Sequence, residues 1–136
     1  MTTDPLLAAL LEVHTKRDQP PLRDWLYVSS GMPVTIRDVV AVVARASDVS
    51  IRDMQSDRRS AGLVVARHIV MYIATHGLGR SSPAIGRALG DRDHTTVLHG
   101  IRRIEKRLAD GDDDLRQRIA AILRVLKMEL DHGTGN

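Results

Sequence analysis

The chain has 136 residues, of which 43% are hydrophobic, but only 2% are aromatic, and it contains no Phe and no Cys. This length favours one domain, and the scarcity of aromatic side chains predicts an aliphatic core in an all-α fold. The lack of cysteine excludes disulfides and thiolate metal sites and favours a cytoplasmic protein. No apolar run approaches the roughly 20 residues that cross a bilayer, and the N-terminus has no basic leader, so we expect neither a membrane span nor a signal peptide.

The net charge of +3 is unevenly distributed along the chain. Residues 56–107 contain ten Lys or Arg and four Asp or Glu, a net +6, whereas residues 1–55 carry −1 and residues 108–136 carry −2. Such a basic excess is compatible with a solubilising surface. A localised basic face is also the electrostatic footprint of a phosphate-backbone partner, and here it coincides with the motif described below.

The N-terminal segment is predicted to be a helix followed by a linker. Apolar residues over 6–13 indicate the helix, and the prolines at 20 and 21 end it. The sequence leaves open whether the next stretch, which contains Trp25 and Tyr27, is a short helix or extended. We expect these aromatic side chains to anchor the segment on the main domain, with a partner-binding patch as the alternative.

Two helices and a single turn are predicted next. Thr35 and Asp38 have the spacing of a capping box, although Asp stands where Glu or Gln is usual, and the helix that they open ends at Ser47. A single helical turn is expected over residues 50–54. The following helix, with its apolar residues over 63–73, is predicted to end over residues 76–79. It is apolar on nearly all sides, which is typical of a central core helix.

Residues 82–99 have the pattern of a helix-turn-helix. Ser82 can cap a short helix with proline in its first turn, and Gly90 can end it because glycine tolerates the left-handed conformation. Asp91 or Asp93 can cap the second helix, whose polar and basic outer side is typical of a recognition helix in a major groove. Its apolar stripe consists of Val97, Ile101, Ile104 and Leu108, and its outer side carries Thr95, His99, Arg102, Arg103 and Lys106.

The aspartates at residues 110–114 break the chain and supply an N-cap for a last helix. Its apolar residues, from Leu115 to Leu130, recur near heptad spacing. Such a stripe can form a coiled-coil dimer seam, but one this short more often packs on its own domain, which is what we expect. The predicted organisation is an N-terminal helix and linker over 1–33, a helix-turn-helix DNA-binding domain over 34–131 and a disordered tail over 132–136.

No constellation for catalysis is recognisable in the chain. The glycine-rich stretch at residues 77–82 follows a helix and lacks the lysine of a nucleotide-phosphate loop. His94 and His99 lie roughly 140° apart around a helix, so they cannot hold one metal from one face. His68 and His76 are expected at the boundary of the core. We therefore expect no enzymatic activity, no metal, no cofactor and no nucleotide.

DNA binding gives the polar residues of the motif definite roles. Asp93 can accept a hydrogen bond from a cytosine amino group, and His94 can donate one to a purine. Thr95 and Thr96 offer a hydroxyl and a methyl group. On a helical wheel His94 lies nearer the core than Thr95, so it reaches bases only by projecting past the first turn. Arg59, on the loop before the core helix, can enter a minor groove, with a solubilising surface as the alternative. Predicted contacts to the DNA backbone come from Arg58, Ser82, Arg87, Arg92, His99, Arg102, Arg103 and Lys106.

Residues 90–99 resemble the signature of the C-terminal DNA-binding domain of the bacterial chromosomal replication initiator, DnaA. The family pattern is G-G-R-D-H-T-T-V-x-H, from which this run departs only at Asp91. Further blocks are similar in the same order, over a resemblance that covers roughly residues 35–130. These blocks are Arg58-Arg59-Ser60, Ala66-Arg67, Met71-Tyr72 and Pro83-x-Ile85-Gly86-Arg87.

The resemblance implies an all-helical domain that binds double-stranded DNA at short asymmetric boxes. It further implies that Asp93 to Thr96 enter the major groove and that Arg59 reaches the minor groove. The residues that it implies at the DNA backbone are Arg67, Arg92 and Arg103.

The chain also departs from the family. Ala61 stands where a second basic residue is usual, Asp91 adds a negative charge beside the phosphates, and Ser82 replaces a leucine. The initiator's ATP-binding module and N-terminal domain have no counterpart, so we expect a free-standing reader of initiator-type boxes, an accessory or regulatory factor in replication initiation. The alternatives are a transcriptional regulator at promoters with such boxes, and an adaptor that binds the full-length initiator or another replication protein through residues 1–33.

Overall fold

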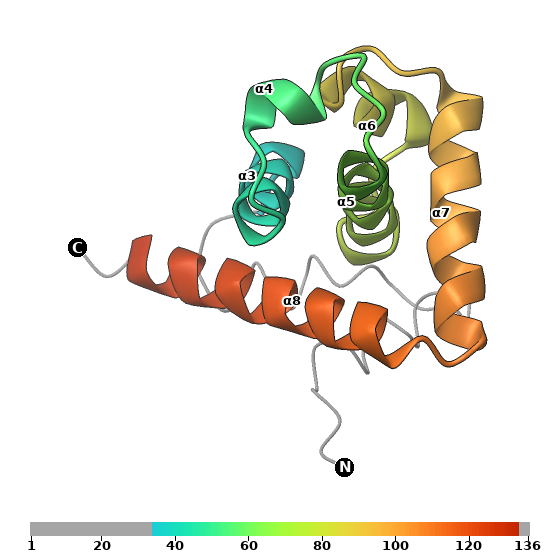
Figure 1. The fold of residues 1–136 in the computed structure, drawn as a ribbon. Coiled ribbons are helices and arrows are strands. Elements are labelled where there is room, and N and C mark those ends of the chain that lie inside the picture. Colours follow the sequence, from blue (N-terminus) through green and yellow to red (C-terminus); the bar gives the residue numbers. More distant parts are fainter. Residues whose placement is uncertain (1–33, 134–136) are drawn as a thin grey trace.

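The computed structural model describes residues 34–133, with side-chain environments up to residue 126, and every regular element in this range is a helix (Figure 1). The predicted helix over 6–13, the aromatic residues Trp25 and Tyr27, and residues 134–136 lie outside this range. The all-α prediction is confirmed for the part described. The elements are α3 (Ile36–Ala46), α4 (Ile51–Met54), α5 (Ala61–Tyr72), η1 (Ile73–Gly77), α6 (Ser82–Ala88), α7 (His94–Ala109) and α8 (Asp113–Gly133).

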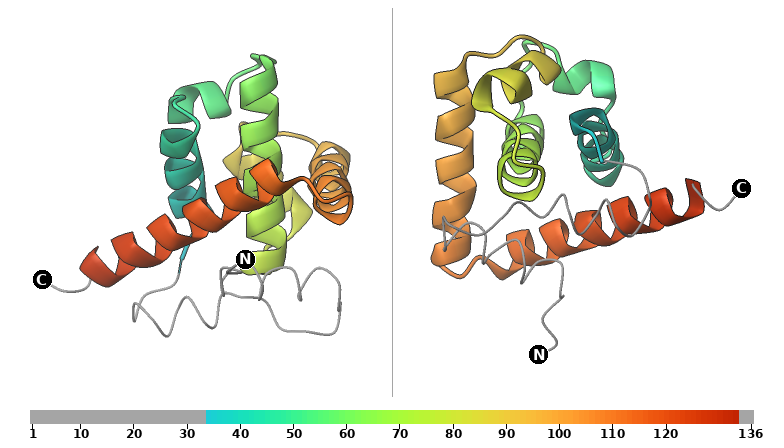
Figure 2. Two further views of the ribbon diagram at one scale, coloured as in Figure 1. Left: turned by 60° about the horizontal axis from the view of Figure 1, so that its bottom comes forward. Right: turned by 180° about the vertical axis from the view of Figure 1, so that it is seen from behind.

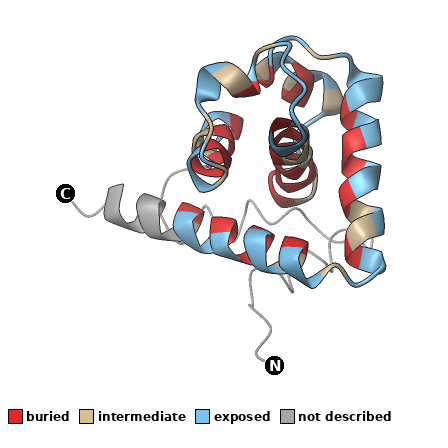
Figure 3. Ribbon diagram, viewed as in Figure 1, coloured by how far each residue is buried: buried red, intermediate tan, exposed pale blue. Residues whose placement is uncertain are grey.

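Helix α5 is the centre of the fold. It lies between α3 and α7, while α6 packs beside α7 and α8 runs from the end of α7 back to α3 (Figures 1 and 2). Because α5 is apolar on nearly all sides, it can be covered from several directions at once, and its Leu63, Ala66, Ile69 and Val70 are buried. The helices α3, α7 and α8 instead turn one buried face inward and one exposed face outward (Figure 3).

The predicted helix starts are set by local hydrogen bonds. The Thr35 hydroxyl accepts from the Asp38 amide at 3.2 Å, and the Thr35 amide donates to the Asp38 carboxylate at 2.9 Å, which completes the capping box. Ser50 caps α4 by accepting from the Asp53 amide at 2.9 Å. At the start of α8, Asp112 accepts from the amide of residue 115 at 3.0 Å, within the predicted aspartate run.

Two helix boundaries differ from the prediction, and a third agrees with it. Ser81, not Ser82, caps α6, because the Ser81 hydroxyl accepts from the amide of Ala84 at 3.3 Å and Ser82 is already the first helical residue. The central helix agrees with the prediction, because it continues beyond Tyr72 as the π-helical segment η1 and ends at Gly77. Helix α8 extends to Gly133, beyond the predicted domain end at residue 131.

The apolar stripe of α8 packs on its own domain. Within the single chain, Leu115, Ile119, Ile122 and Leu126 are buried against the common core. The side chain of Leu130 lies outside the described part of this helix. No helix in residues 34–133 has the length and apolar character that crossing a bilayer requires.

Candidate nucleic-acid interface

The turn of the helix-turn-helix, residues 89–93, joins α6 to α7 through two left-handed residues. Gly90 has φ +85° and Asp91 has φ +60°, so the predicted glycine stop is confirmed and the next residue continues the bend. The Arg92 amide then donates to the Gly86 carbonyl at 2.9 Å, which closes the turn on α6. This geometry places the start of α7 at a corner of the domain, beside α6 (Figure 1).

Asp93 is the N-cap of α7, as one of the two predicted alternatives had it. Its carboxylate accepts from the Thr95 amide at 3.1 Å and lies 3.1 Å from Nδ1 of His94. The hydrogen bond from the Thr95 backbone is the main cause that lowers the pKa of Asp93, with smaller help from the Thr95 side chain and from His94. An anionic cap also suits the positive end of a helix.

The first residues of α7 are presented to solvent together. The side chains of Asp93 and His94 are 64% and 60% exposed, and Thr95 and Thr96 are exposed as well. His94 therefore does not turn towards the core, although the helical wheel placed it nearer the core than Thr95. It is the first helical residue and projects from the open end of α7.

The rest of α7 has the predicted two-sided character. Its inner face buries Val97 and Ile101, and Gly100 allows close packing on α5, since a Cβ at Gly100 would overlap Met71 Sδ and lie 2.7 Å from the His68 ring. The exposed outer residues are His99, Arg102, Arg103 and Lys106. The outer face of α7 is thus basic, and it lies opposite the buried residues that hold the helix in place.

The segment before α5, residues 55–60, is here called the basic loop. Its Arg58 and Arg59 are both exposed, as predicted for residues that could reach a duplex. Arg58 makes an ion pair with the half-buried Asp53 at 3.6 Å, and such a long pair with an exposed arginine is weak enough to exchange for a phosphate. The basic loop lies beside the turn, since a Cβ at Gly90 would overlap the Gln55 carbonyl oxygen.

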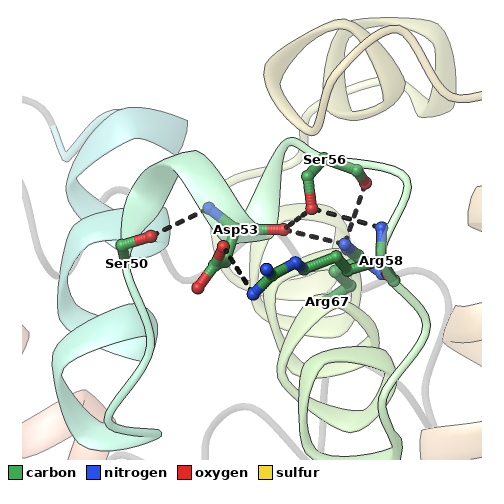
Figure 4. A network of polar contacts seen from close by, with 5 residues as sticks. All are labelled: Ser50, Asp53, Ser56, Arg58 and Arg67. Carbon is green, nitrogen blue, oxygen red and sulfur yellow. Dashed lines mark hydrogen bonds and ion pairs between the residues drawn. The ribbon is translucent and has the colours of Figure 1, made fainter.

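The structure corrects the prediction that Arg67 contacts the DNA backbone. Arg67 is only 3% exposed, and its guanidinium donates inward to four main-chain carbonyls around the basic loop. The acceptor residues Asp53, Ser56 and Arg58 are drawn in Figure 4. The acceptors are Met54 (2.9 Å), Arg58 (2.6 Å), Asp53 (2.8 Å) and Ser56 (2.9 Å). One signal in the sequence pointed this way, because position 67 lies within a helix that is apolar on nearly all sides.

Arg92 is half-buried and serves partly as a link within the protein. Its guanidinium donates to the Leu89 carbonyl and, at 2.7 Å, to the Ser56 carbonyl. Sequence reasoning missed this role, since Ser56 is distant in the chain. Because the side chain is only half-buried, it can still reach a phosphate. Of the other predicted contacts, Ser82 is half-buried at the start of α6 and Arg87 is exposed in its last turn.

The two core-boundary histidines are half-buried, as predicted. His76 lies 2.8 Å from Glu105 of α7, and the His68 ring meets the His99 ring edge-on at 6.4 Å between centroids. Burial, and then the neighbouring charge of His99, lowers the pKa of His68. Within the described residues, no cluster of three or more His, Cys, Asp or Glu side chains could hold a metal ion.

Comparison with known proteins gives a consistent result. Residues 36–104 match the family model described as the bacterial DnaA protein helix-turn-helix. The chain is 37% identical over 126 residues to the chromosomal replication initiator protein DnaA of Rhodopseudomonas palustris strain TIE-1, covering 86% of this chain and 26% of that protein. It is 43% identical over 101 residues to the DnaA protein of Rhizobium johnstonii, covering 73% of this chain and 21% of that protein. The chain thus spans about a quarter of the length of these curated relatives.

Proposed function

Because the chain belongs to the family of the bacterial DnaA protein helix-turn-helix, we propose that it binds double-stranded DNA with the start of α7 in the major groove. The preferred sites are short initiator-type boxes, and the role is accessory or regulatory in the initiation of chromosomal replication. One observation carries the proposal: four consecutive polar side chains, Asp93 to Thr96, are exposed at the open end of a helix whose other face is buried.

Base reading would come from these four side chains. The cap uses Oδ1 of Asp93, so Oδ2 can accept from a cytosine amino group. His94 can donate to a purine acceptor, while Thr95 and Thr96 can contact a thymine methyl or a phosphate. The exposed Arg59 of the basic loop would reach the adjacent minor groove.

Contacts to DNA phosphates would surround the four base-contacting side chains. Lys106 is one side chain that can bind a phosphate. Its ion pair with Asp110 at 3.0 Å is exposed and worth only about 0.3–0.5 kcal/mol, so it is easily exchanged. Binding should therefore weaken steeply with salt as counterions return to the duplex. The proposed backbone contacts are Arg58, Ser82, Arg87, Arg92, His99, Arg102, Arg103 and Lys106.

Fluorescence anisotropy tests the proposal with a duplex that carries an initiator-type box and a scrambled duplex of the same composition. Thr95→Ala should lose about 1–3 kcal/mol on the box and little on the scrambled duplex. Arg103→Ala should weaken both alike and flatten the salt slope by about one unit. Arg37→Ala, an exposed arginine on α3 across α5 from α7, is the matched control and should change neither. Equal binding of the parent to both duplexes would refute the proposal.

The cellular role is tested separately by genome-wide mapping of the protein's binding sites. Occupancy centred on replication origins supports a role in replication initiation and association with the nucleoid. Occupancy confined to promoters would replace that role with transcriptional regulation while leaving the DNA-binding proposal intact.

A further inference from the structure

One carbonyl group joins the central helix, the basic loop and the turn. The Ser56 oxygen accepts from Arg67 Nη2 at 2.9 Å and from Arg92 Nη2 at 2.7 Å. Arg67 belongs to α5 and Arg92 to the turn, so the two guanidiniums converge on the loop from different elements. Hydrogen bonds from charged donors are among the stronger ones in proteins, which makes this a firm junction.

Two further contacts bind the basic loop to the helix-turn-helix. The Gln55 side chain donates to the Ala88 carbonyl, at the end of α6, at 3.1 Å. Gly90 approaches the Gln55 main chain so closely that a Cβ would lie 2.9 Å from its carbonyl carbon. The segments that carry Arg59 and the start of α7 are therefore in contact, although they are far apart in the sequence.

The Arg67 guanidinium lies among both positive and negative side chains at this junction. Burial, followed by the charges of Arg92 and Arg59, lowers the pKa of Arg67, whereas Asp53 and Asp57 raise it. The guanidiniums of Arg67 and Arg92 thus meet at one carbonyl, within reach of the charge of Arg59, and all three stay protonated because arginine does not lose its proton in proteins. The four carbonyls and the two carboxylates offset this repulsion, so the loop geometry depends on Arg67 being bonded to them.

We propose that Arg67 is a positioning residue for DNA recognition, which fixes the basic loop against the turn so that Arg59 and the start of α7 are held at one separation before DNA arrives. The proposal rests on the proposed function, because it needs both elements to read one duplex. Holding them in advance removes part of the ordering cost of binding. Lysine cannot replace this arginine, since a single ammonium cannot span four carbonyls as a planar guanidinium does.

The test measures coupling between Arg67 and Arg59 on the box duplex. In the parent, Arg59→Ala should weaken binding by about tenfold or more. In the Arg67→Lys background, the same change should alter affinity by less than about twofold, because the loop no longer presents Arg59 correctly. Thr95→Ala is the matched control and should keep its full cost in both backgrounds. An unchanged cost of Arg59→Ala in the Arg67→Lys background would overturn the proposal.

The salt slope separates positioning from a direct phosphate contact. In a background that carries both Arg58→Ala and Arg59→Ala, adding Arg67→Met should leave the slope of log affinity against log salt unchanged. A phosphate-binding Arg67 would instead lower the slope by about one unit, and that result would also overturn the proposal.

Hydrogen exchange of the free protein keeps the proposal testable without DNA. Arg67→Lys should speed exchange in both 55–60 and 88–92 and leave residues 113–126 unchanged. If Arg67→Lys does not fold, Gln55→Ala takes its place, because it removes only the hydrogen bond from the exposed Gln55 side chain to the Ala88 carbonyl. This variant too should speed exchange in both segments and reduce the loss of affinity that Arg59→Ala causes. Exchange that stays at the parent rate in either segment would refute the junction. A parent that fails to discriminate the box would refute the proposed function but not this result.

Discussion

Gly90→Ala tests how far the fold depends on the close approach between the turn and the basic loop. Gly90 has φ +85°, where a side chain costs about 1–2 kcal/mol. A Cβ there would also overlap the Gln55 carbonyl oxygen, so the two backbones would have to separate by roughly 1 Å. Glycine is thus required at this position for two independent reasons.

The magnitude follows from the bonds that such a separation would break. The Gln55 bond to the Ala88 carbonyl is neutral and worth about 0.5–1.5 kcal/mol, and the Arg92 bond to the Ser56 carbonyl is charged and worth about 1.5–3 kcal/mol. Added to the conformational term, these losses give about 3–6 kcal/mol. Since domains are stable by only about 5–15 kcal/mol, the variant should be close to unfolding.

Gly111 provides a matched control because it has the same φ, +85°, while a Cβ added there would meet no atom within 4 Å. Gly111→Ala should therefore cost only the conformational term, about 1–2 kcal/mol. Urea unfolding followed by the helical circular dichroism signal gives both values. If the two variants were equally destabilised, the close approach would contribute nothing and the reasoning would be refuted.

Three further predictions concern the turn and its cap. Asp91→Gly should relieve the left-handed strain at φ +60°, stabilise the fold by about 1 kcal/mol and tighten binding to box and scrambled duplexes alike; unchanged affinities would place the Asp91 carboxylate away from the phosphates. The pKa of Asp93 is lowered by the Thr95 amide, so its contribution to stability is present at neutral pH and lost as the pH falls through the acidic range. Asp93→Asn keeps a cap that does not titrate, so urea midpoints between about pH 6 and pH 3 should fall less than in the parent, and an identical fall would contradict the cap. Gly86→Ala would bring a Cβ into overlap with the Arg92 carbonyl oxygen and should cost about 1–3 kcal/mol in urea unfolding, whereas a neutral effect would show that the turn can move aside.

The sequence by itself determined the features that depend on neighbours a few residues away. The capping box at Thr35 and the glycine stop at Gly90 are local hydrogen bonds or backbone conformations, so residue type and spacing were sufficient to predict them. For the cap of α7 they left two candidates, Asp91 and Asp93, of which the structure selects Asp93. The buried face of α7 followed from helical periodicity for the same reason. The signature at 90–99 is likewise one continuous stretch.

Only the tertiary structure decided what the arginines do. Arg67 and Arg58 both lie in blocks of the family pattern, yet one is buried and the other exposed. The difference arises because carbonyl groups of the basic loop converge on α5 only after the chain has folded, and main-chain acceptors have no residue type that a sequence could reveal. The exposure of His94 was decided similarly, because a helical wheel treats the first residue as if a preceding turn covered it.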